Sequence, residues 1–201
     1  MFAGLAAAYI LRDEFDTGDE PNPIGIPGGA QIPLVIQDRQ FNPDGTFFYP
    51  TSDIEGAIWI GEYFGDVMLV NGKVWPFLNV EPRISRFRIL NGCNARILNL
   101  DISGSDFWQI GAEGGLWDIP VRMRRLVLAP AERADVIVDF SRFAGQTLVM
   151  KNHRPPSPIS NPAPQLPQVM QIRVGTTVSQ PGPSSVRQVC PGARLTSAAR
   201  S

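Results

Sequence analysis

Hydrophobic and polar residues alternate in short runs along most of the chain. In the run RISRFRILN, Ser85, Phe87 and Ile89 fall on one side, and Arg86 and Arg88 fall on the other. Side chains of a β-strand point alternately to its two faces. This period of two therefore predicts a half-buried strand.

A second run, ARILNLDI, has the same period. Leu98, Leu100 and Ile102 are expected to face inward, and Asn99 and Asp101 outward. Further apolar runs, IPLVIQDRQF, DFWQIGAEGG, VRMRRLVLAP, QTLVMKN and PQVMQIRV, are also predicted strands.

The stretch LAPAERADVIVDF, residues 128–140, combines alternation with charge. One side carries Ala134, Val136, Val138 and Phe140. Glu132, Arg133 and Asp135 could form an acid–base site or the polar corner of a sheet. An acid–base pair needs a pocket and a perturbed pKa, which the pattern does not indicate. We therefore predict a sheet corner, in which the carboxylates accept backbone N–H groups and Arg133 pairs with one of them.

Turn signals separate the runs. Asn71-Gly72 tolerates the positive φ angles of a type I′ turn and predicts a hairpin, and Pro43-Asp44-Gly45 predicts another turn. Residues 153–167 contain six prolines and are expected to form an extended loop. Short strands at this spacing predict an all-β sandwich or barrel over residues 31–175.

The two ends of the chain differ from this region. Residues 2–12 are a short apolar segment, and residues 13–30 are acidic, then rich in proline and glycine, as in a linker. Residues 176–201 lose the alternation and are predicted to be a disordered tail.

The charge balance excludes some classes of partner. The 201 residues include 18 basic and 19 acidic ones, which leaves no electrostatic footprint for nucleic acid. The longest uncharged apolar stretch, residues 2–11, is about half as long as a membrane-spanning helix. We expect neither a membrane span nor a signal peptide, and the compartment stays open.

The metal-binding residues are few. A blue copper site takes two imidazoles, a thiolate and a weak axial ligand, and His153 is the one histidine of the chain. His153 is interpreted as loop surface and Cys93 as a small buried side chain, and Cys190 lies in the predicted tail. The other candidate ligands and pocket residues are interpreted as core or interface residues; they are Met68, Met123, Met150, Met170, Trp59, Trp75, Trp108 and Trp117.

Several segments together resemble the multicopper oxidases, in particular the bacterial spore-coat laccases and bilirubin oxidases. The resemblance spans residues 2–174 and rests on five segments in the order that the family shows. They are AGLAAAYILRDE, IPLVIQDRQFNPDGTFFYP, FGDVMLVNGKVWPFLNVEPRISRFRILNGCNARILNLDI, FWQIGAEGGL and LAPAERADVIVDF.

The resemblance implies a cupredoxin-like Greek-key β-barrel or sandwich that corresponds to the second of the family's three cupredoxin domains. Residues 1–12 would be the remnant of the last strand of the first domain, 13–30 a linker and 31–175 the second domain. The family's copper ligands lie in the first and third domains. None of their His-x-His or His-Cys-His motifs has a counterpart here, so we predict no catalytic, cofactor-binding or metal residue in this chain.

The expected function is that of a copper-free middle domain in a laccase-like oxidoreductase. The parent enzyme would oxidise phenolic or pigment substrates or metal ions and reduce dioxygen to water. Its other two cupredoxin domains would be the partners, and this chain, from a truncated or split gene, would be inactive alone. Two alternatives stay open: a non-catalytic scaffold of the cell envelope or division machinery, and a half-enzyme that binds copper between subunits.

Overall fold

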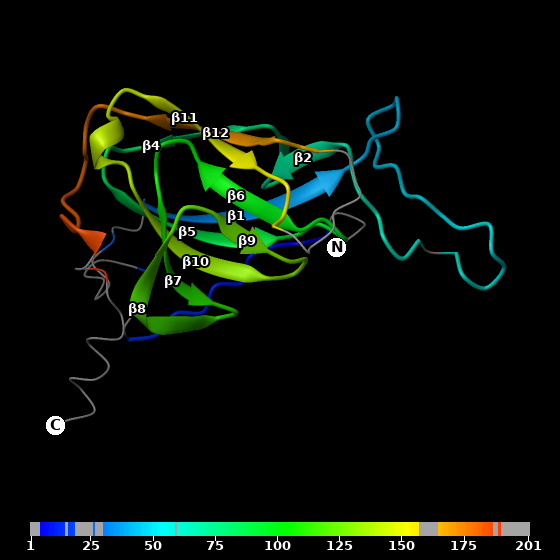
Figure 1. Ribbon diagram of the computed structural model, residues 1–201, viewed down its shortest axis with the longest axis horizontal. Helices are drawn as coiled ribbons and strands as arrows, with labels where there is room; N and C mark the ends of the chain where they lie inside the picture. Colours follow the sequence, from blue (N-terminus) through cyan, green and yellow to red (C-terminus); the bar gives the residue numbers. More distant parts are fainter. Residues whose placement is uncertain are drawn as a thin grey trace.

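Two β-sheets face each other in the computed structural model of the chain (Figure 1). The structure describes residues 5–14, 16–18, 26, 30–58, 60–156, 165–186 and 189. One sheet has seven strands in the order β3 (Lys73–Val74), β2 (Val67–Val70), β1 (Gln31–Arg39), β5 (Ile84–Asn91), β10 (Arg133–Asp139), β7 (Phe107–Ala112) and β8 (Gly115–Met123). The other has five in the order β4 (Phe77–Val80), β12 (Gln168–Val174), β11 (Thr147–Asn152), β6 (Leu98–Ile102) and β9 (Leu126–Leu128). The all-β prediction is confirmed.

The chain passes repeatedly from one sheet to the other. Most neighbouring strands are antiparallel, but β1 pairs with β5 and β4 pairs with β12 in parallel. A short 3-10 helix, η2 (Ser141–Phe143), joins β10 to β11. No helix among the described residues is long and apolar enough to cross a membrane.

The inner faces of both sheets form the main core. The predicted inward residues Phe87 and Ile89 of β5 and Phe140 after β10 are all buried there. The rings of Phe87 and Phe140 meet edge to face, with centroids 6.1 Å apart. Met68 and Met150 also lie in this core, as the strand pattern predicts.

Two hairpins depend on residues that accept positive φ angles. Asn71 and Gly72 have φ angles of 49° and 77° and join β2 to β3, which confirms the predicted type I′ turn. Glu113 and Gly114, with φ angles of 53° and 89°, join β7 to β8 in the same way.

One predicted strand, VRMRRLVLAP, is divided in two. Its first part belongs to β8 of the seven-stranded sheet, and residues 126–128 form β9 of the five-stranded sheet. Arg124 and Arg125 make the crossing. A pattern of alternation cannot show this, because both parts keep the period of a strand.

The predicted outward faces are more buried than expected. Arg86 and Asn99 are 1% and 3% exposed, although their positions in the alternation place them opposite the core. The segment after β11 covers Asn99, whose side chain donates to the backbone oxygen of Arg154. Other segments of the chain thus cover part of the second face of both sheets.

An ion network fixes the N-terminal segment on the seven-stranded sheet. Asp16 lies 2.8 Å from a guanidinium nitrogen of both Arg86 and Arg88, and Asp135 binds Arg86 with both carboxylate oxygens. Burial alone would lower the pKa of Arg86, but its bonds to Asp135 and Asp16 outweigh this and hold the pKa above its ordinary value. Arg86 therefore keeps its charge under a segment seventy residues away in sequence.

A second apolar cluster lies on the outer side of the same sheet. Segments from both ends of the chain meet it, and its buried members are Ile26, Ala30, Ile84, Ile110, Ile137, Val186 and Val189. The disordered tail proposed for residues 176–201 stays a prediction, since residues 190–201 lie outside the described part of the chain.

Substitution of Asp135 tests this network. Asp135→Ala leaves the buried guanidinium of Arg86 with Asp16 as its remaining carboxylate partner. We expect it to lower the free energy of unfolding by about 3 kcal/mol, because a buried guanidinium that loses its two-oxygen partner is left partly unpaired. Chemical denaturation measures the change.

The matched control is Glu113→Ala, which removes the exposed ion pair of Glu113 with Arg133. It should change the free energy of unfolding by less than about 1 kcal/mol. Equal effects of the two substitutions would show that the Arg86 network does not stabilise the fold.

Candidate functional site: a projecting arm and its buried anchor

His153 serves as a structural partner. Its Nε2 atom lies 2.8 Å from Oδ1 of Asp101, and its backbone N–H donates to the oxygen of Asn99. The side chain of His153 is 31% exposed, so this pair lies at the surface, where the proline-rich segment begins. The predicted surface role of His153 agrees with this placement.

Cys93 is fully buried. Its backbone N–H donates to Oδ1 of Asn91, and burial, followed by the charge of Asp38, raises the pKa of its thiol well above the ordinary value. A thiol that stays protonated is a poor nucleophile and a poor metal ligand. Cys190 lies outside the described residues.

The charged residues of the stretch 128–140 bind separate partners. Glu132 accepts the backbone N–H of Ala129 at 2.7 Å, and Arg133 pairs with Glu113 rather than with a carboxylate of its own stretch. Asp135 belongs to the Arg86 network. These contacts support the predicted sheet corner and correct the expected partner of Arg133.

Two of the described tryptophans, Trp75 and Trp108, have separate surroundings. Trp108 packs against the second apolar cluster, and Trp75 is 54% exposed beside a shallow hollow. The lining residues of this hollow, Trp75, Val149, Gln168, Met170 and Gln171, include no titratable group. Trp59 lies outside the described residues.

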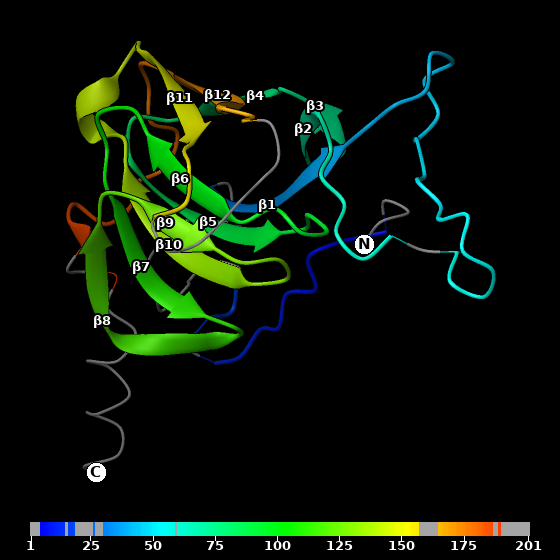
Figure 2. The ribbon, with the colours of Figure 1, turned by 45° about the vertical axis from the view of Figure 1, so that its right-hand side comes forward.

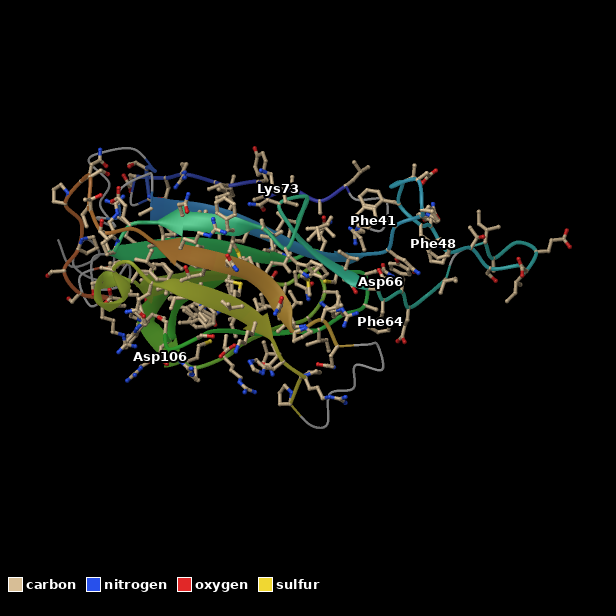
Figure 3. All side chains as sticks on the ribbon, turned by 90° about the horizontal axis from the view of Figure 1, so that it is seen from above. Phe41, Phe48, Phe64, Asp66, Lys73 and Asp106 are labelled. Carbon is tan, nitrogen blue, oxygen red and sulfur yellow. The ribbon has the colours of Figure 1, made fainter. Side chains whose placement is uncertain are left out.

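The most distinctive feature of the fold is the long connection between β1 and β2. Residues 40–66, here called the arm, leave the sandwich and project from it in both ribbon views (Figures 1 and 2). Phe41, Phe48, Phe64 and Asp66 lie at the root of the arm (Figure 3). Close to the sandwich, an isolated bridge joins Phe41 to Phe47.

A buried ion pair anchors the arm. Oδ2 of Asp38 accepts from Nε of Arg96 at 2.8 Å and from the backbone N–H of Gly65 at 2.9 Å. Nη2 of Arg96 donates to the oxygen of Gly65 at 2.8 Å, so both backbone groups of this glycine are bound. The side chains of Asp38 and Arg96 are 0% exposed. The pair therefore connects the end of β1 to the returning end of the arm.

Glycine is required at the anchor because the backbones come close. A Cβ atom on Gly65 would lie 2.3 Å from the backbone nitrogen of Arg39, which is shorter than any normal contact. Asp66 donates its N–H to the oxygen of Arg39 at 3.1 Å, and the guanidinium of Arg96 lies 5.6 Å from the ring centroid of Phe64. The return of the arm is thus held tightly against β1.

The surface of the arm is both apolar and acidic. Its exposed apolar side chains are Phe47, Phe48, Tyr49, Ile54, Ile58 and Ile60. Its sequence contains five carboxylates and no lysine, arginine or histidine; the acids are Asp44, Asp53, Glu55, Glu62 and Asp66. No described residue forms an ion pair with any of the five. Such a surface is typical of a contact site for another molecule.

Copper ligands are not gathered anywhere in the part of the chain that the structure describes. No group of three or more His, Cys, Asp or Glu residues there is arranged to hold a metal ion. The arm and its anchor are the candidate functional site among the described residues.

Comparisons with known proteins place this fold in a family. The chain is 37% identical to the laccase of Bacillus subtilis over 188 residues, covering 90% of this chain and 36% of that protein. It is 40% identical to the multicopper oxidase LPR1 of Arabidopsis thaliana, covering 81% of this chain and 28% of that protein. No family model matches.

Solved structures agree. The McoA multicopper oxidase of Aquifex aeolicus superposes with a TM-score of 0.65 at 34% identity, over 78% of this chain and 34% of that one. The chain is homologous to part of these multicopper oxidases. The likeness confirms the predicted cupredoxin-like fold. The chain spans about a third of the length of the multicopper oxidases that it matches.

The anchor was not predicted from the sequence. Asp38 and Arg96 are far apart along the chain, and the alternation of β1 assigns Asp38 to the same side as Leu34 and Ile36 without indicating a partner. The one signal for the arm is its composition, a stretch between two apolar runs that carries acids and no bases.

Gly65→Ala tests the anchor. The added methyl group would displace the backbone of Arg39, and we expect a loss of about 2 kcal/mol in unfolding free energy. The loosened arm should also be cut faster between residues 40 and 66 in limited proteolysis. Both effects are measured against the unchanged chain.

Gly115→Ala is the control, because a Cβ atom there meets only the oxygen of Ala112, at 3.7 Å. It should leave cleavage of the arm unchanged. If Gly65→Ala is as resistant to protease as the control, the close approach at Gly65 does not hold the arm.

Proposed function

We propose that this chain is the copper-free structural domain of a multicopper oxidase. In the parent enzyme it would correspond to the second cupredoxin domain and hold the first and third in position. The parent would oxidise phenolic or pigment substrates or metal ions, one electron at a time, and pass the electrons to dioxygen. The single histidine, in a chain homologous to about a third of a laccase, carries this proposal.

The copper ligands of a blue site do not fit the residues present. Such a site needs two imidazoles and a thiolate. His153 binds Asp101, and the thiol of Cys93 is buried with a raised pKa. Met68 and Met150 lie in the main core, and no group of three or more His, Cys, Asp or Glu among the described residues is arranged to hold a metal beside them. We therefore assign no step of the copper chemistry to a residue of this chain.

The proposed domain division follows the strands. Residues 31–175 would be the second domain, and the strands from Gln31 to Val174 support this division. Residues 1–12 would be the remnant of a preceding domain and 13–30 the linker. Asp16, which pairs with Arg86 and Arg88, would then fasten the linker to the sheet.

Copper analysis tests the proposal. The purified chain, incubated with copper and dialysed, should retain far less than one ion per molecule and show no blue absorption band. The variant His153→Ala should give the same copper content, because His153 has a structural partner.

The positive control is the laccase of Bacillus subtilis, carried through the same incubation and dialysis. Stoichiometric copper in this chain, with a blue band that His153→Ala abolishes, would overturn the copper-free assignment.

A further inference from the structure

The charged side chains of the arm are all acidic, and no described residue forms an ion pair with them. Its carboxylates flank exposed apolar side chains, among them Ile54 and Ile58, which are 68% and 71% exposed. A hydrogen bond from Thr46 holds the pKa of Asp44 below its ordinary value, so this acid is charged at neutral pH. An apolar surface bordered by basic side chains would complement the arm in both polarity and charge.

The same chain carries a surface of that kind. Three arginines contact the turn at residues 103–106, and Arg125 follows one of them in the sequence; the four, here called the arginine end, are Arg122, Arg124, Arg125 and Arg142. Arg124 donates to the oxygen of Ser105, and Arg142 donates to the oxygen of Gly104 at 2.7 Å. Three separate elements thus bring their guanidinium groups together.

Two carboxylates at the arginine end, Asp101 and Asp106, do not neutralise its four arginines; Asp101 lies 4.0 Å from Arg124. Asp106 pairs with Arg122 and lies 3.9 Å from Arg124, whose side chains are 65% and 54% exposed. Arg125 forms no ion pair with any described residue. Ion pairs this exposed are weak, so the arginines remain available to an incoming acid.

Exposed apolar residues flank the arginine end as well. Ile119 and Val121 of β8 are 73% and 46% exposed, and Val127 of β9 is 38% exposed. Arm and arginine end therefore match in both respects, apolar against apolar and acid against base.

The two surfaces lie at opposite ends of the molecule. Asp106 marks the arginine end, and Phe41 and Phe48 mark the root of the arm on the other side of the sandwich (Figure 3). A chain cannot bring its own arm to its own arginine end without unfolding. A second copy can do so, because its arginine end is free to approach.

We propose that the arm of one copy docks on the arginine end of a second copy. The contact is head to tail and uses two different surfaces, so repetition of the same contact closes a ring or extends a filament. The proposal is independent of the copper-free assignment, and either can fail while the other stands.

Analytical ultracentrifugation of the unchanged chain is the first test. Over a dilution series in low salt, the weight-average mass should rise to at least twice that of the monomer. In about 1 M NaCl, where the Debye length falls to about 3 Å, the chain should shift toward the monomer.

Charge reversal identifies the two surfaces. One variant carries Asp53→Arg and Glu55→Arg in the arm, and the other carries Arg124→Glu and Arg125→Glu at the arginine end. Each variant alone loses the charge complementarity between the two surfaces and should associate at least about tenfold more weakly. When the two variants are mixed, the arm of each variant faces an end of opposite charge on the other variant. Association should then be restored.

Lys73→Glu is the control, since Lys73 lies on the hairpin between the two ends (Figure 3). It should associate like the unchanged chain, and thermal unfolding monitored by circular dichroism confirms that all variants are folded. A monomer at every concentration in low salt would overturn the proposal and leave the arm to another domain of a longer protein. Variants that stay monomeric when mixed would overturn it too.

Discussion

The buried ion pair of Asp38 and Arg96 determines where the arm leaves the sandwich. Two fully desolvated charges are costly, and hydrogen bonds to their other polar atoms offset part of that cost; Oδ1 of Asp38 has no such bond among the described residues. Here the backbone of Gly65 supplies both a donor for Asp38 and an acceptor for Arg96. The pair thus requires the returning end of the arm to lie against β1. Both ends of residues 40–66 are therefore fixed at the same place on the sandwich. The position of the projecting arm therefore depends on an ion pair that is fully buried.

Charged groups elsewhere in the fold have the same kind of role. Asp135 and Asp16 bind Arg86, Glu132 accepts a backbone N–H at a sheet corner, and Asp101 binds His153. In each case a titratable group among the described residues meets a fixed partner in the fold.

The inner faces could be predicted from the sequence, while the outer faces could not. Phe87 and Ile89 alternate with arginines, and their burial follows from the period alone. The burial of Arg86 depends on Asp16, seventy residues earlier, and no local pattern contains that pairing. The division of β8 from β9 was missed for a related reason: a change of sheet at Arg124 and Arg125 leaves the alternation on either side intact. The resemblance identified the family, but the arm's exposure and its anchor became visible only in three dimensions.

An unneutralised acidic arm is costly to keep without a partner. Its five carboxylates repel one another, and its apolar side chains stay in water, so both features favour contact with a complementary surface. Within a multicopper oxidase of about three times this length, a neighbouring domain could supply that surface. The arginine end of the same chain supplies one as well, at the far side of the sandwich. Because the two ends complement each other, a single copy of this domain already contains both halves of an interface, and head-to-tail assembly requires no component beyond a second chain.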